Sequence, residues 1–205
     1  MDSLSELGIS PIHSPEQAAQ HKLGPVIEKM RRSGRLQREV VEGIDYYYQN
    51  RADTGFTGVH LGTLSSRASD IAHLGTVTAT ADGRWCVIYD PQSVSRTSDT
   101  ELTLSLAEEY SHMTDMHAIF RSEGRARAMT HEEVAESEIK ARTFVVDVYE
   151  ELKRQGHRYS ELDQPLAEVQ RIRLMRATRM LSEEKASAKI REVIIKHLSD
   201  SGYNL

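Results

Sequence analysis

The spacing of hydrophobic residues changes along the chain, and each change marks a different kind of element. Between residues 16 and 50 apolar residues recur at three- and four-residue steps, as one face of a helix requires. Gly34 separates two such runs and predicts a break between two helices. The stripe consists of Leu23, Val26, Ile27, Met30, Leu36, Val40, Val41 and Ile44. We expect an N-terminal helical segment over 16–50, preceded by a flexible leader over residues 1–15.

The pattern becomes β-like after residue 51. Residues 51–75 are rich in Gly, Ser and Thr, which favours loops and short strands. Two β-prone runs, 76–80 and 85–89, then flank Asp82-Gly83, a dipeptide typical of hairpin turns. Pro91 has no N–H to continue a strand, so it should end the second run. These features predict an antiparallel hairpin.

Helical spacing returns beyond a polar loop at 93–98. One helix should begin near Asp99 or Thr100, and a second should run from about His131 to Gly156. Thr130 and Glu133 have the spacing of a capping box at the start of the second helix. Further helices are expected at 164–181 and 182–200. The predicted fold is α+β: mainly helical, with a small antiparallel sheet packed on one helix, and with residues 51–205 as one domain joined to the N-terminal segment.

Composition excludes several classes of function. The chain has 205 residues, a net charge of −5 and a single cysteine, Cys86, expected to be a buried thiol. One cysteine rules out an intramolecular disulfide and Cys/His zinc fingers, and the charge gives no indication of nucleic-acid binding. A basic cluster is best interpreted as the solvated face of a helix: Lys29, Arg31, Arg32, Arg35 and Arg38.

The sequence contains no apolar run near the roughly 20 residues that span a bilayer, and the first residues lack the features of a signal peptide. We therefore expect folding in the cytoplasm of the producing cell. Secretion by a route that reads no hydrophobic signal is compatible with this sequence.

One segment carries candidate chemistry. Within residues 104–115, Glu108 and His112 stand four residues apart, which on a helix places them on one face, and Glu109 lies between them. This segment resembles the HExxH helix of zincin metallopeptidases, with Glu108 where the first His stands in that family. Glu138 followed by Ala141 is similar to the acidic-x-x-Ala signature of gluzincins. The order of elements over about residues 55–157 resembles metallopeptidase-like domains of bacterial toxins and effectors.

The resemblance implies a role for each of these residues. Glu108, His112 and Glu138 would bind a metal ion, and Glu109 would accept a proton from the attacking water. A Glu/His/Glu set is more anionic than one with two histidines. Such a set leans toward Mn²⁺, Mg²⁺ or Ca²⁺ compared with a site of two histidines. The resemblance implies Zn²⁺, with Mn²⁺ or another divalent ion as the alternative and no metal if the site is degenerate. Activity would then be reduced or lost.

Each candidate also has a simpler interpretation. Glu108 and Glu109 would then form a solvated helix face, His112 would be a structural histidine, and Glu138 would pair with Arg142 as a surface salt bridge. Further candidates rest on residue type or position alone: Asp115 and His117 as partners of the ligands, and Tyr149 and His157 as oxyanion stabilisers.

Two hypotheses about function follow. In the first, the chain is a metal-dependent hydrolase of zincin type that acts on a peptide or protein. In the second, it is a catalytically inactive peptidase-like fold that binds a protein as an effector or adaptor. Metal content separates the two.

Overall fold

Two helices form the N-terminal segment and meet at the predicted glycine. The computed structural model describes residues 15–62, 64, 74–157 and 164–200. α1 (Pro15–Arg31) and α2 (Arg35–Gln49) flank Gly34, and the short α3 (Arg51–Thr54) follows. The apolar stripe is buried or half-buried and the five clustered basic residues are exposed or half-exposed, so both predictions are confirmed. Residues 1–14 of the predicted leader lie outside the described residues, and residue 15 already belongs to α1.

The sheet contains the predicted hairpin and one strand that the sequence did not specify. Among the described residues its order is β1 (Phe56–Leu61), β3 (Trp85–Tyr89), β2 (Gly75–Ala79). β2 and β3 pair antiparallel, and Gly83 supplies a positive φ of 78° in their turn. β1 pairs parallel with β3, so the sheet is mixed rather than purely antiparallel. β2 forms one edge.

A short helix replaces part of the loop expected at 93–98. α5 (Pro91–Arg96) begins directly after β3, and the Asp90 side chain caps it by accepting a hydrogen bond from Ser93 N–H at 2.7 Å. Proline is tolerated in the first turn of a helix, where its missing N–H would have no partner. The expectation of a loop is therefore wrong for residues 93–96, because Pro91 both ends the strand and starts a helix.

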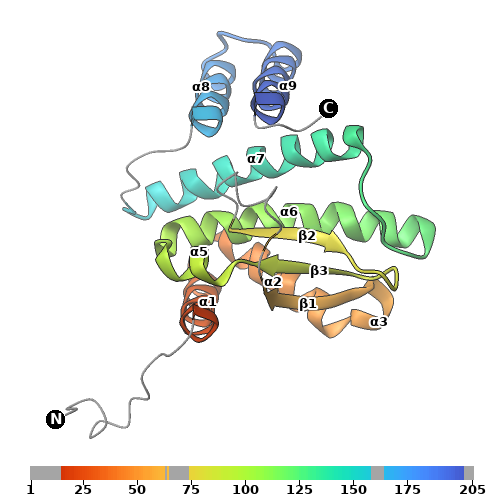
Figure 1. Ribbon diagram of the computed structural model, residues 1–205. Coiled ribbons are helices and arrows are strands. Elements are labelled where there is room, and N and C mark those ends of the chain that lie inside the picture. The colour runs from red at the N-terminus through yellow and green to blue at the C-terminus, as the bar shows by residue number, and fades with distance from the viewer. Residues whose placement is uncertain (1–14, 63, 65–73, 158–163, 201–205) are drawn as a thin grey trace, which may run out of the picture.

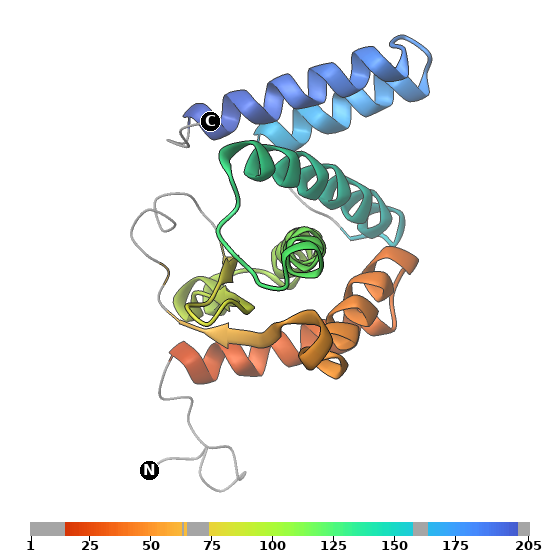
Figure 2. The same cartoon turned by 90° about the vertical axis from the view of Figure 1, so that its right-hand side faces the viewer.

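The long helix α6 (Asp99–Glu123) lies at the centre of the molecule. Figure 2 shows it almost end-on, with α7 on one side, α1 and α2 on another, and the sheet beside it. Residues 102–107 are all buried in succession, so every side of this stretch is covered. A helix that is enclosed in this way can present polar side chains to a protected space rather than to bulk water.

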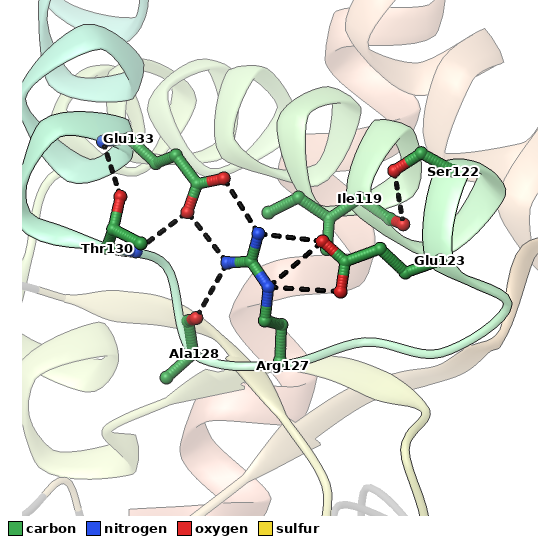
Figure 3. A network of polar contacts seen from close by, with 7 residues as sticks. All are labelled: Ile119, Ser122, Glu123, Arg127, Ala128, Thr130 and Glu133. Carbon is green, nitrogen blue, oxygen red and sulfur yellow. Dashed lines mark hydrogen bonds and ion pairs between the residues drawn. The ribbon is translucent and has the colours of Figure 1, made fainter.

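α7 (His131–Arg154) runs back along α6, and the connection between them is held by charged contacts. The guanidinium of Arg127 bonds Glu123 at the end of α6 and Glu133 in the first turn of α7, with nitrogen–oxygen distances from 2.7 to 3.1 Å (Figure 3). Thr130 and Glu133 form the predicted capping box. These contacts fix the start of α7 against the end of α6, so the two long helices keep a defined register.

The C-terminal helices pack as a pair on the outer side of α7 (Figures 1 and 2). They are α8 (Gln164–Ala177) and α9 (Glu183–Asp200), close to the predicted ranges. The α+β class is thus confirmed, with helices predominating. Among the described residues, no helix is both long and apolar enough to cross a bilayer.

Candidate metal centre

α6 and α7 bring the three predicted ligands together. Glu108 and His112 lie one turn apart on α6, and Glu138 faces them from α7. Each residue offers a ligand atom, and these atoms all lie within 4.8 Å of one another. The shared ion predicted from the sequence requires these three residues to converge within about 6 Å, because ligand distances are near 2 Å. That geometric prediction is confirmed.

The cluster is enclosed rather than solvated. Glu109 is 5% exposed and Glu138 is 7% exposed, while Glu108 and His112 are largely buried. The solvated-face interpretation of Glu108 and Glu109 is therefore wrong. Burial of this many carboxylates is costly unless a cation or hydrogen-bond donors compensate it, so their partners define the chemistry of the site.

His112 is oriented by a partner on α7. Its Nδ1 lies 2.8 Å from the Ser137 hydroxyl oxygen, and its Nε2 lies 3.6 Å from Glu138 Oε1. When Ser137 accepts from Nδ1–H, Nε2 carries the lone pair and points it into the cluster. A hydrogen bond to the remote ring nitrogen is the usual way in which proteins hold a metal-binding histidine. Ser137 was missed in the sequence, although it directly precedes Glu138 on the same helix.

Arg142 enters the cluster from α7, one turn beyond Glu138. Its Nε lies 3.4 Å from Glu108 Oε1 and 3.5 Å from Glu138 Oε2, and the residue is 6% exposed. The expected pairing of Glu138 with Arg142 is present, but it is buried and it includes Glu108. The interpretation as a surface salt bridge is wrong because α6 packs against this face of α7.

Glu109 points from α6 toward β2, where its carboxylate accepts a hydrogen bond from the Val77 backbone N–H. Burial raises the pKa of this carboxyl well above its usual range, and the charges of Glu108 and Glu138 raise it further. The Val77 hydrogen bond and the Arg142 charge act in the opposite direction. Glu109 is thus a buried carboxyl next to the three candidate ligands, and its basicity is enhanced by its surroundings.

The carboxylates accept fewer hydrogen bonds than burial requires. Glu108 Oε1, Glu109 Oε2 and Glu138 Oε2 are buried, and none of them accepts a hydrogen bond within the described part of the chain. Buried polar atoms normally have a partner, and each exception calls for an explanation. His112 and one carboxylate oxygen each of Glu108 and Glu138 form a donor set that suits a divalent cation. The residues present therefore fit a metal ion.

A cavity of about 420 Å³ opens beside the cluster. One wall is β2, from Thr76 to Ala79, and the facing walls come from α6, α7 and the loop before α7. His112, Ser137 and Glu138 supply its polar end, while Met116, Met129 and Val134 supply apolar surface. The space can accept a ligand that is apolar on one side and has a polar group directed at the candidate metal centre.

The remaining candidates lie elsewhere. Asp115 pairs with Lys140 at 2.7 Å, and His117 packs edge-on against Tyr47. Tyr149 is about 16 Å beyond Glu138 along the axis of α7, and His157 follows the end of that helix, so neither lines the cavity. Cys86 is buried as expected, and burial raises the pKa of its thiol.

Comparison with protein-family models, curated proteins and solved structures finds no match for this chain. The assignment of a function therefore depends on the residues of the chain itself and on their geometry.

Proposed function

We propose that this chain is a metal-dependent hydrolase that resembles a zincin metallopeptidase. In this proposal Glu108, His112 and Glu138 hold a divalent ion, with Zn²⁺ the first candidate and Mn²⁺ the alternative. Convergence of the three ligand atoms within 4.8 Å, from two helices and in a largely buried position, is the observation that carries the proposal. The buried carboxylate oxygens without hydrogen-bond partners in the described part of the chain support it.

A divalent ion held by these residues would supply Lewis-acid chemistry, which activates water and polarises a carbonyl group. Glu109 accepts the proton of the attacking water and passes it to the leaving nitrogen of the peptide. Burial raises the pKa of Glu109 above that of an exposed carboxyl, and this favours uptake of a proton by this residue. Ser137 holds the ring of His112, so Nε2 stays directed at the cluster.

The cavity beside β2 is the natural place for the substrate in this proposal. β2 is an edge strand of the sheet that the described residues form, and an extended peptide can lie along such an edge. Met116, Met129 and Val134 would contact an apolar side chain of that peptide. A peptide or protein is accordingly the proposed substrate class.

The second candidate function is a catalytically inactive fold that binds a protein. Glu108 in the position of a histidine and the ion pairs of Arg142 with two ligand carboxylates favour it. Arg142 already supplies one positive charge to the buried carboxylates, which weakens the need for a metal ion. The two candidates differ in metal content.

Metal analysis of protein purified without added ion tests the proposal directly. The hydrolase proposal expects stoichiometric metal, or binding and a raised melting temperature when Zn²⁺ or Mn²⁺ is added. Glu138→Gln should abolish that binding. Glu132→Gln, an exposed position in the first turn of the same helix, should leave it unchanged. If the wild type neither contains nor binds metal, the inactive binding fold replaces the hydrolase.

Restoring the histidine gives a second test. Glu108→His should raise zinc affinity, because imidazole suits zinc better than a carboxylate does. In that background, Glu109→Gln should abolish any peptide hydrolysis and keep the metal, since Glu109 is not a ligand. Calorimetric zinc titration of the wild type and both variants measures this. A Glu108→His variant with wild-type zinc affinity would contradict the assignment of Glu108 as a ligand.

A further inference from the structure

Arg142 contacts the candidate ligands, yet neither metal binding nor proton transfer assigns it a role. It is buried, it projects from the same helix as Glu138, and its Nε contacts one oxygen of each carboxylate ligand. An arginine stays charged in proteins, and its planar head suits contact with two carboxylates. Arg142 is therefore a fixed positive charge inside the candidate metal centre.

The contacts divide the two oxygens of Glu138 between two partners. Oε1 lies 3.6 Å from His112 Nε2, whereas Oε2 lies 3.5 Å from Arg142 Nε. Glu108 likewise has its Oε1 next to Arg142, at 3.4 Å. A carboxylate oxygen that faces a guanidinium charge is less available to a cation than the other oxygen of the same group. Both ligands should therefore bind through a single oxygen.

Arg142 also changes the charge of the site. The carboxylates of Glu108 and Glu138 bring two negative charges, neutral His112 brings none, and Arg142 brings one positive charge. The net charge of the four residues is −1. A set of two histidines and one glutamate has the same value, so Arg142 offsets the extra charge that Glu108 introduces.

From these two effects we infer that Arg142 sets the ion selectivity of the site, in favour of Zn²⁺ over Ca²⁺ and Mn²⁺. The inference rests on the proposed function, since it concerns the same ligands. Zn²⁺ is satisfied by three protein ligands at about 2.0–2.2 Å and one water. Ca²⁺ takes about 6–8 oxygens, often from bidentate carboxylates, and Mn²⁺ also prefers oxygen-rich, more anionic sites. Arg142 withholds those additional oxygens.

Arg142→Met removes the charge and keeps an unbranched side chain in the buried space. The freed oxygens and the extra negative charge should strengthen Ca²⁺ and Mn²⁺ binding more than Zn²⁺ binding. We expect the ratio of zinc to calcium affinity to fall about 10-fold or more, which corresponds to one unit on a logarithmic scale. Competition titrations with the three ions measure the ratio without any activity assay. Arg154→Met, at the exposed end of the same helix, is the matched control and should leave the ratio unchanged.

Loss of Arg142 leaves two buried carboxylates without their cation, and Arg142→Met can for that reason fail to fold. The double variant Glu108→His, Arg142→Met avoids this, because its net charge is again −1. It should bind zinc at least several-fold more tightly than Glu108→His alone, since the uncompensated positive charge of the single variant is gone. Circular dichroism establishes that each variant is folded.

The outcomes distinguish the two proposals. If the wild type binds zinc and folded Arg142→Met keeps the wild-type ratio of zinc to calcium affinity within twofold, Arg142 does not set ion selectivity. The proposal of a metal site is unaffected by that result. Equal zinc affinities of Glu108→His and the double variant would overturn the inference in the same way. If neither the wild type nor any variant binds an ion, the proposed function itself fails. If metal binds only after Arg142 is removed, Arg142 blocks the site, and the selectivity role is wrong.

Discussion

The hydrogen bond between Ser137 and His112 offers a sharp test, because it touches the candidate metal centre without removing a ligand. Ser137→Ala deletes the hydroxyl that lies 2.8 Å from His112 Nδ1. Ser137 is 3% exposed and lines the cavity together with His112, so a water that replaces the hydroxyl would not be fixed to the backbone of α7 as Ser137 is. The ring nitrogen then has no protein partner at this position, and the ring is free to turn its Nε2 away from Glu138.

The expected loss of zinc affinity follows from the role of this hydrogen bond in orienting the His112 ring. Removing the partner of a metal-binding histidine typically lowers metal affinity about 10- to 100-fold. In free energy this is about 1.4 to 2.7 kcal/mol of binding. Leaving a buried nitrogen unpaired also costs the fold about 1–3 kcal/mol. We therefore expect weaker zinc binding together with a modest decrease in stability.

Calorimetric zinc titration and urea unfolding of the same samples measure both effects. Ser122→Ala is the matched control, since its hydroxyl bonds the Ile119 carbonyl at 3.0 Å near the far end of α6, away from the cluster. It should leave zinc affinity unchanged. A Ser137→Ala variant that is folded and binds zinc within twofold of wild type would refute the orienting role of Ser137.

Two further predictions concern the scaffold. Gly43→Ala should destabilise the fold by about 1–3 kcal/mol in urea unfolding, because a Cβ at this position would lie 2.1 Å from the Tyr110 ring where α2 meets α6. Gly24→Ala is the control and should be neutral or stabilising, because a Cβ there would have nothing within 4 Å. Equal effects of the two substitutions would contradict the close packing at Gly43. The Arg127 side chain and the Thr130 N–H hold the pKa of Glu133 down, at about 2. Because this pKa is lower in the folded protein than its unfolded value of about 4.3, the ionised Glu133 stabilises the folded state at pH values above about 4.3. This stabilisation is lost as the pH falls through 2. Glu133→Gln should therefore lower stability by at most ~1 kcal/mol above pH 5, since the carboxylate is partly exposed, and by progressively less toward pH 2. A difference between wild type and Glu133→Gln that does not change with pH would argue against the ion pair as its source.

Local features of the sequence determined much of the architecture, since neighbouring residues decide them. The Asp82-Gly83 turn specified the hairpin, because Gly83 adopts a positive φ at no steric cost. Thr130 and Glu133 specified the start of α7, because each side chain bonds the backbone of the other. The four-residue spacing of Glu108 and His112 likewise placed them on one face of α6 before any packing was known.

Only the tertiary structure decided what surrounds that face. The parallel pairing of β1 joins strands that are distant in sequence, and no turn chemistry specifies such a partner. Burial of Arg142 depends on α6 and α7 packing together, so its i, i+4 pairing with Glu138 looked like an ordinary surface contact. The contact between Ser137 and His112 spans the same interface. Spacing along one helix determines which side chains share a face, but the charge, hydrogen bonds and enclosure of a site depend on the second helix that closes it.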